Sequence, residues 1–149
     1  MDEILLSVKG NMDLINPENQ IEIDLNDIPE TAKELMIQGN EGLIKLAISN
    51  LLDNACKYSD NEKVIAKIIT ENQNLKLIIS DQGIGIPPDE LEKIRQPFYR
   101  AANVRTIQGF GFGLSLTHKI MKLHRGQVEI NSESGRGTTV ILIFPLQDS

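Results

Sequence analysis

Residues 41–58 read Glu-Gly-Leu-Ile-Lys-Leu-Ala-Ile-Ser-Asn-Leu-Leu-Asp-Asn-Ala-Cys-Lys-Tyr, and apolar side chains recur there every three or four positions. This spacing predicts a long amphipathic helix. Asn50, Asn54 and Lys57 follow one another at intervals of four and three residues, so they share one stripe of that helix. Two amides and an ammonium suit a metal-bound polyphosphate, because an amide oxygen can bind Mg²⁺ and a lysine neutralises phosphate. The alternative is an ordinary polar stripe that faces solvent or caps its neighbours.

The patterns on either side of this helix predict the rest of the fold. Two pairs of the predicted strands are joined by short turns, which indicates a mixed, mainly antiparallel sheet. Strands interspersed with helices predict a two-layer α/β sandwich whose helices cover one face of the sheet. The further predicted helices span 2–14, 89–95 and 113–124, and the predicted strands span 20–25, 35–37, 64–70, 75–81, 127–132 and 138–145.

A carboxylate and two glycines follow the apolar strand predicted at 75–81. The segment is Asp81-x-Gly83-x-Gly85. Glycine lacks a Cβ and lets a ligand approach the backbone closely, while a carboxylate there can accept a hydrogen bond from the exocyclic amine of a planar heterocycle. An ordinary β-turn would give the same short pattern, so this segment alone leaves both interpretations open.

A second glycine group precedes the last predicted helix. Residues 109–114 read Gly-Phe-Gly-Phe-Gly-Leu, and free backbone N–H groups at a helix start attract anions. The spacing is neither that of a dinucleotide-binding GxGxxG segment nor that of a P-loop. The long stretch before it lacks periodicity, and such loops inside compact domains often close over a ligand. We therefore expect a mobile lid at 96–112.

The length and charge of the chain limit its function. It has 149 residues, 15 basic and 21 acidic side chains and a net charge of −6, which favours one domain over 1–149 and disfavours a nucleic-acid surface. No apolar run approaches about 20 residues and no signal-peptide pattern occurs, so we expect a cytoplasmic protein without direct membrane contact. The single cysteine, Cys56, is expected to pack in the core. Residues 93–125 nevertheless contain no acid and seven bases, namely Lys93, Arg95, Arg100, Arg105, Lys119, Lys122 and Arg125.

In order and spacing, these segments resemble the sequence boxes of sensor histidine kinases. Residues 50–59 resemble the N box, 81–87 the first glycine box, 97–100 the F box and 109–116 the second glycine box, while 134–139 resemble the closing Gly-Thr segment. The resemblance runs from about residue 35 to residue 146. It implies the Bergerat-type ATP-binding sandwich that is shared with gyrase, the large heat-shock chaperone and mismatch-repair ATPases.

The resemblance also implies roles for individual residues. Asn54 would hold Mg²⁺ with help from Asn50, and Asp81 would accept a hydrogen bond from the adenine amino group with support from Thr138. Catalytic contacts with phosphate would come from Asn50, Lys57, Arg100 and Arg105, the two arginines being expected γ-phosphate ligands in the lid. The remaining nucleotide-binding residues would be Tyr58, Gly83, Gly85, Ile86, Gly109, Gly111, Gly113 and Leu114.

The resemblance further implies phosphoryl transfer rather than rapid hydrolysis. ATP hydrolases of this fold resemble one another in having a glutamate as general base at the position of Asn50, and an amide cannot accept a proton at neutral pH. Neither His118 nor His124 has the context of a phosphorylated histidine. We therefore expect a monomeric catalytic domain that phosphorylates a histidine on a separate dimerisation domain and serves a response regulator, with residues 1–15 as the end of the connection to that domain. The alternatives are a non-catalytic nucleotide-binding module and an anti-sigma-type serine kinase.

Overall fold

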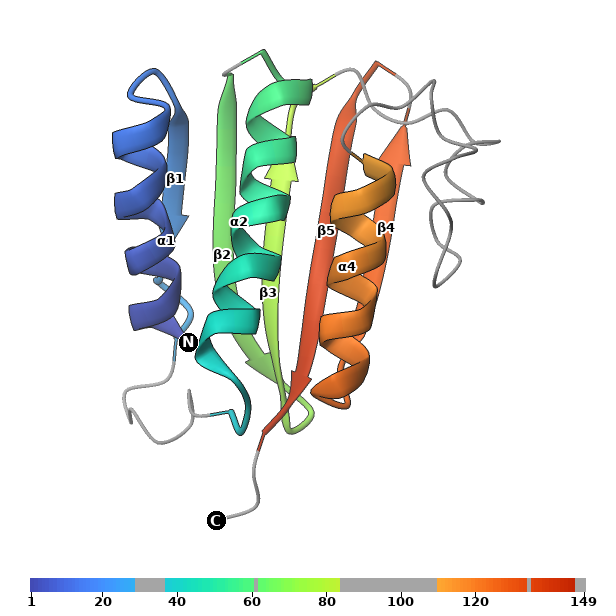
Figure 1. Cartoon of the computed structure of the whole chain (residues 1–149). Coiled ribbons are helices and arrows are strands. Elements are labelled where there is room, and N and C mark those ends of the chain that lie inside the picture. Colours follow the sequence, from blue (N-terminus) through green and yellow to red (C-terminus); the bar gives the residue numbers. More distant parts are fainter. Residues whose placement is uncertain (29–36, 61, 84–109, 134, 147–149) are drawn as a thin grey trace.

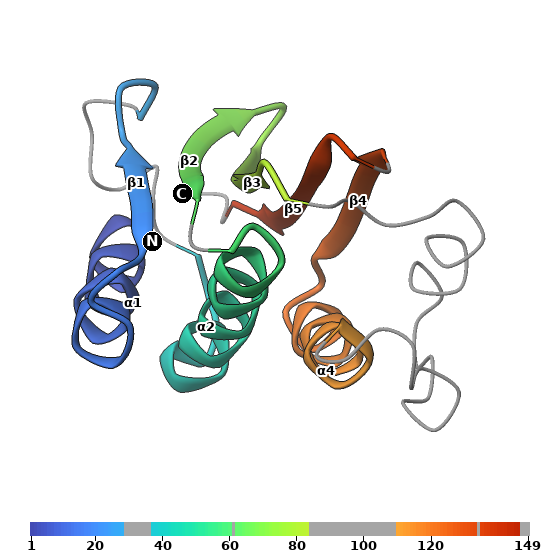
Figure 2. The same cartoon turned by 90° about the horizontal axis from the view of Figure 1, so that it is seen from above.

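The computed structural model describes residues 1–28, 37–60, 62–83, 110–133 and 135–146, apart from the side chains of 57, 58, 110–115 and 133. Within these ranges, three helices and five strands form two layers (Figure 1). Seen from above, all three helices lie on the same face of the sheet (Figure 2). In chain order the elements are α1 (Asp2–Ile15), β1 (Gln20–Asp24), α2 (Glu41–Tyr58), β2 (Lys63–Glu71), β3 (Asn74–Asp81), α4 (Phe110–Leu123), β4 (Gln127–Glu133) and β5 (Gly137–Pro145).

The sheet is mixed, with the strand order β1-β2-β3-β5-β4. Among the described strands, the β1–β2 pair is parallel, and the β2–β3, β3–β5 and β4–β5 pairs are antiparallel. Antiparallel neighbours can be joined by tight turns, as β2–β3 and β4–β5 are here. The register brings the end of β3 beside the start of β5, with Ser80 opposite Thr139. This corner of the sheet is where the predicted base-binding residues lie.

The hydrophobic core lies between the sheet and the helices. In β3, every second side chain faces the helices, and Leu75, Leu77 and Ile79 are buried there. From the helical layer, α2 contributes Ile44, Ile48 and other buried residues, and α1 adds Leu5, Val8 and Met12 to the same core. The helix α1 therefore packs as part of this sandwich. That residues 1–15 also lead to another domain stays a prediction.

The predicted elements are confirmed with few changes. The predicted bounds of α2 agree with those of the structure, and the predicted strands of both hairpins lie within one residue of the observed ones. The helix α4 begins at Phe110 rather than at 113, so 110–112 belong to this helix and not to the predicted lid. The predicted strand at 35–37 is wrong at Ile37, which has no register with a neighbouring strand, and its other residues lie outside the described ranges. The predicted helix at 89–95 also lies outside them.

Candidate functional site

Asp81 ends the buried face of β3. It continues the alternation of Leu75, Leu77 and Ile79, so its carboxylate points toward the helices instead of toward solvent and is only 9% exposed. Its Oδ1 accepts hydrogen bonds from the backbone N–H groups of Gly83, at 2.8 Å, and Thr138, at 3.2 Å. Both bonds end on one oxygen. Among the described residues no hydrogen bond ends on the other oxygen, Oδ2, which can therefore accept one from a ligand.

Burial and hydrogen bonding act in opposite directions on Asp81. Burial raises the pKa of this carboxyl, and the two backbone N–H groups, from Gly83 and Thr138, lower it. Burial has the larger effect, so the pKa of Asp81 lies above the ordinary value of 3.8. A perturbed carboxyl in a cleft is typical of a functional site.

Gly137 allows Thr138 to reach Asp81. Its φ is +101°, a conformation that residues with a side chain rarely adopt. A Cβ built on Gly137 would lie 2.1 Å from the carbonyl oxygen of Asp81, which is far inside van der Waals contact. Only glycine fits between these two strand ends. No local pattern in the sequence predicts this role of Gly137.

Asn54 faces the same corner from α2. Its side chain is 6% exposed, and its Nδ2 is buried without a hydrogen-bond partner among the described residues. An unsatisfied buried amide is costly and calls for a ligand, a water or an ion. Asn50, one turn earlier, is half-buried on the same helix. The backbone of Lys57 and Tyr58 forms the last turn of α2, which places these residues at the same end of the helix.

A small cavity joins Asn54 to the base-binding residues. It has a volume of about 10 Å³, which is room for roughly one water molecule. Its polar lining residues are Asp81 of β3, Thr138 of β5 and Asn54 of α2. The structure therefore brings these three sequence-predicted residues together. The cavity is lined by Leu51, Asn54, Ala55, Ile79, Asp81, Thr138 and Val140.

The start of α4 supplies the groups that suit an anion. Gly111, Gly113 and Leu114 all lie within its first five residues, where the first backbone N–H groups have no partner inside the helix. The dipole of a helix makes its N-terminal end favourable for negative charge. Phosphate binding there stays a prediction. The predicted site residues Gly85, Ile86, Arg100, Arg105 and Gly109 lie outside the described ranges.

The donors in the described part of the site fit magnesium better than a transition metal. No cluster of three or more His, Cys, Asp or Glu side chains occurs among the described residues. Mg²⁺ does not need one, because it keeps several waters and takes one or two protein oxygens together with substrate phosphates. The amide of Asn54 is such a protein oxygen donor.

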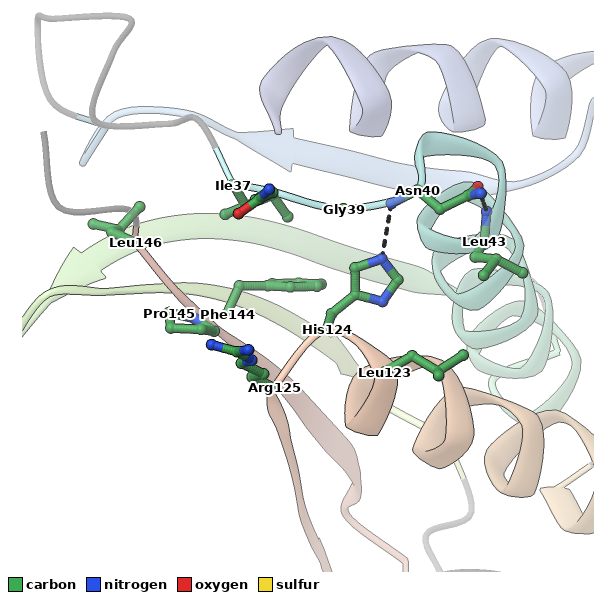
Figure 3. Close-up of a pocket in the computed structure, with 11 residues that line it drawn as sticks. Ile37, Gly39, Asn40, Leu43, Leu123, His124, Arg125, Phe144, Pro145 and Leu146 are labelled. Atoms are coloured by element: carbon green, nitrogen blue, oxygen red, sulfur yellow. Dashed lines mark hydrogen bonds between the residues drawn. The ribbon is translucent and has the colours of Figure 1, made fainter.

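A second cavity in the described residues, of about 770 Å³, lies at the other ends of α2 and α4 (Figure 3). It contains none of the predicted site residues. Leu43, on its wall, and Asn54 are eleven residues apart on α2, which is about 16 Å along a helix. We assign no ligand to this cavity, because no carboxylate stands among the described residues that line it.

His124 lines this larger cavity and makes two hydrogen bonds there. Its Nδ1 donates a hydrogen bond to the carbonyl oxygen of Ile120 at 2.7 Å, and its Nε2 accepts one from the backbone N–H of Asn40 at 2.9 Å (Figure 3). The Nδ1 bond holds the ring against the last turn of α4, and the Nε2 bond joins the end of α4 to the segment before α2. This geometry gives His124 a structural role.

Cys56 packs in the core as predicted. Its side chain is buried on α2, and burial, with a smaller contribution from the nearby Asp53 carboxylate, raises the pKa of its thiol to about 11. A thiol with so high a pKa is a poor nucleophile and a poor metal ligand. Of the helices in the described ranges, none is both long and apolar enough to cross a membrane.

Comparison with known proteins identifies the family. Residues 39–148 match the model of the histidine kinase-, DNA gyrase B-, and HSP90-like ATPases. The chain belongs to this ATPase family. An ATPase domain binds ATP.

The similar proteins are sensor kinases. The chain is 34% identical over 113 residues to the adaptive-response sensory kinase SasA of Thermosynechococcus vestitus and 39% identical over 116 residues to the sensor protein RprX of Bacteroides fragilis. Each match covers 74% of this chain but only 30% and 22% of those relatives, so the chain spans less than a third of their length. The solved structure of the mycobacterial sensor histidine kinase MprB has the same fold, with a TM-score of 0.77, 22% identity and coverage of 100% of this chain and 96% of that one. The sandwich and the family expected from the sequence are thus confirmed.

Proposed function

We propose that this chain is the ATP-binding catalytic domain of a sensor histidine kinase. It binds Mg-ATP and passes the γ-phosphoryl group to a histidine on a separate dimerisation domain, and a response regulator acts downstream. The observation that supports this proposal best is the meeting of Asp81, Thr138 and Asn54 at one buried corner of a histidine-kinase-type ATPase fold. The proposed protein is cytoplasmic in this part of its chain and monomeric as an isolated domain.

Each group at the site has a task in this proposal. Oδ2 of Asp81 accepts a hydrogen bond from the adenine amino group, while Gly83 and Thr138 hold the carboxylate in place. Asn54 offers an amide oxygen to Mg²⁺, which when bound neutralises charge on the phosphates. The other proposed contacts are those of Asn50, Lys57, Tyr58, Gly85, Ile86, Arg100, Arg105, Gly109, Gly111, Gly113 and Leu114 with the nucleotide.

The residue at position 50 favours transfer over hydrolysis. Asn50 stands on α2 one turn before Asn54, where the proposed metal contact is made. An amide does not take a proton from water at neutral pH, so the chain has no general base at this position. Phosphoryl transfer needs mainly positioning and charge stabilisation, and an incoming histidine brings its own nucleophile.

The decisive experiment supplies that histidine. The domain is mixed with the dimerisation fragment of a sensor kinase, γ-labelled ATP and Mg²⁺, and the fragment is analysed for label before and after mild acid. We expect acid-labile label on the fragment, because a phosphohistidine is cleaved in acid. Acid-stable label would indicate a serine kinase, and ATP binding without transfer to any fragment from a related kinase would indicate a non-catalytic module.

Replacing Asn54 by Ala tests the magnesium contact. We expect the variant to fold, because the change removes a buried amide whose Nδ2 has no partner in the described structure. ATP dissociation constants are measured by calorimetry with Mg²⁺ and with a chelator. In the parent protein Mg²⁺ should tighten binding, and in Asn54→Ala the ratio of the two constants should fall to about one.

Asn131→Ala is the matched control for Asn54→Ala. Asn131 is an exposed asparagine on β4, outside the small cavity, so its removal should leave the magnesium effect unchanged. A magnesium effect of the parent size in Asn54→Ala would show that Asn54 does not hold the metal.

A further inference from the structure

Asp81, Ser132 and Thr138 lie near one another where β3 and β4 end and β5 begins. Ser132 of β4 lies directly opposite Thr138 of β5, and their hydroxyl oxygens are 2.8 Å apart. The backbone N–H of Thr138 in turn donates to Oδ1 of Asp81. Thr138 is thus held on one side by a serine and on the other by the carboxylate that is proposed to bind the base.

The hydroxyl proton of each residue can be assigned from its partners. The hydroxyl of Ser132 donates to the carbonyl oxygen of Gly137 at 3.0 Å, and a carbonyl can only accept. The single hydroxyl proton of Ser132 is used in that bond. Either hydroxyl of the pair could be the donor. We assign the proton between them to Thr138, whose O–H then donates to Oγ of Ser132, because the Ser132 hydroxyl donates to Gly137. Because the Thr138 hydroxyl proton points toward Ser132 and away from the small cavity, the Thr138 oxygen can only accept a hydrogen bond inside that cavity.

The cavity beside Thr138 consequently presents acceptors. Thr138 and Asp81 both line it, and its remaining walls are apolar except for Asn54 of α2. Thr138 offers an oxygen lone pair and Asp81 offers Oδ2. A water held in this cavity that donates to both oxygens has only lone pairs left for the base. Directly or through such a water, this end of the cavity suits an N–H donor.

We propose that Ser132 is a positioning residue for nucleotide selection. By accepting the hydrogen bond of the Thr138 hydroxyl, Ser132 leaves only acceptors, the Thr138 oxygen and Oδ2 of Asp81, to face the base. This arrangement favours a 6-aminopurine over a 6-oxopurine. This inference rests on the proposed function, because it assumes that the base of ATP binds against Asp81 and Thr138 at the edge of this cavity. Ser132 does not touch the nucleotide in this account. It acts through the direction of one hydroxyl bond.

The sheet contains a matched control for this pair. Ser80 of β3 lies opposite Thr139 of β5, and their hydroxyl oxygens are 3.2 Å apart. Neighbouring residues of a strand point to opposite faces, so this pair lies on the face of the sheet away from the helices and the cavity. Ser80→Ala and Ser132→Ala thus break the same kind of cross-strand hydroxyl pair on opposite faces.

The test compares ATP with inosine triphosphate, which carries an oxygen in place of the 6-amino group. Dissociation constants for both are measured by calorimetry on the parent, Ser132→Ala and Ser80→Ala, and thermal melting confirms that each variant is folded. In Ser132→Ala the Thr138 hydroxyl regains the freedom to donate into the cavity. We expect the preference for ATP to shrink by roughly threefold to tenfold, the contribution of one hydrogen bond. Ser80→Ala should keep the parent preference.

Two further variants make the result specific. Thr138→Val removes the hydroxyl, so adding Ser132→Ala to it should not change the preference further. Ser132→Thr keeps a hydroxyl donor and should retain the parent preference. An unchanged preference in a folded Ser132→Ala protein, or an equal loss in Ser80→Ala, would overturn the role of Ser132. If the parent itself binds neither nucleotide, the proposed function fails instead.

Discussion

Replacing Asp81 by Asn is expected to abolish measurable ATP binding without reducing the stability of the fold at neutral pH. The asparagine Oδ1 can still accept from the N–H groups of Gly83 and Thr138, so the turn remains closed. Its Nδ2, however, puts a donor where Oδ2 faced the adenine amino group, and two donors then confront each other. Loss of a hydrogen bond to a charged group together with this mismatch should weaken binding by roughly a hundredfold or more.

The expected stability of Asp81→Asn follows from the direction of the pKa shift. Burial raises the pKa of Asp81 in the folded state, so the stability that this group contributes is fully present below the unfolded value of 3.8 and is lost as the pH rises through the raised folded value. At neutral pH the parent therefore carries the cost of a buried carboxylate, and the neutral amide does not. The variant should be at least as stable as the parent at pH 7, and this difference should vanish as the pH falls below 3.8.

Asp24→Asn is the control for this substitution. Asp24 ends β1, and its Oδ1 accepts from the backbone N–H of Asn26, two residues further on, at 3.0 Å, just as Asp81 accepts from Gly83. The chemical change and the local turn are thus the same, but Asp24 is outside the small cavity. ATP binding should survive in Asp24→Asn. Calorimetric titration showing parent-like affinity in Asp81→Asn would remove Asp81 from the site.

Replacing Gly137 by Ala should damage both the fold and the site. The new Cβ would lie 2.1 Å from the carbonyl oxygen of Asp81 and 3.0 Å from the Cα of Gln82, so β3 and β5 must separate at this end. The positive φ of +101° adds strain. Overpacking and backbone strain cost about 1–3 kcal/mol each, so the variant should lose on the order of 3 kcal/mol of unfolding free energy in urea. ATP affinity should fall with it, because Thr138 moves away from Asp81.

Gly135→Ala separates the clash from the strain. Gly135 lies in the same hairpin turn and also has a positive φ, of +83°, but no atom of the described residues lies within 4 Å of the Cβ position built on it. This variant should lose about 1 kcal/mol through strain alone and should bind ATP like the parent. Equal losses in Gly135→Ala and Gly137→Ala would mean that the close approach to Asp81 has no importance.

The sequence predicts most of this fold because its patterns are strong and local. The 18 residues of α2 carry an uninterrupted helical period, and the alternation that ends in Asp81 indicates both a strand and the face that its carboxylate occupies. Ile37 shows the limit of such patterns, since three apolar residues do not specify a strand without a partner. The start of α4 at Phe110 shows another, because glycines lower helix propensity without preventing a helix.

The parts of the site that the sequence did not predict depend on contacts across the sheet. Ser132 carries no local signal, and its pairing with Thr138 follows only from the register of the β4–β5 hairpin. A register taken from the glycine-containing turn between these strands would have suggested the pair. The close approach of Gly137 to Asp81 joins residues 56 positions apart, and only the strand order reveals it. Backbone contacts between residues so far apart produce no recognisable pattern in the sequence.

The rate at which the buried thiol of Cys56 reacts can report local opening of the core. Cys56 is the only cysteine in the chain, and its pKa of about 11 keeps almost none of it as the reactive thiolate at neutral pH while the core is closed. An alkylating reagent can therefore modify it only when α2 lifts from the sheet or the domain unfolds. Because Cys56 lies two residues beyond Asn54, the rate of modification with and without nucleotide measures how far ligand binding closes this half of the sandwich, with no label or engineered residue required.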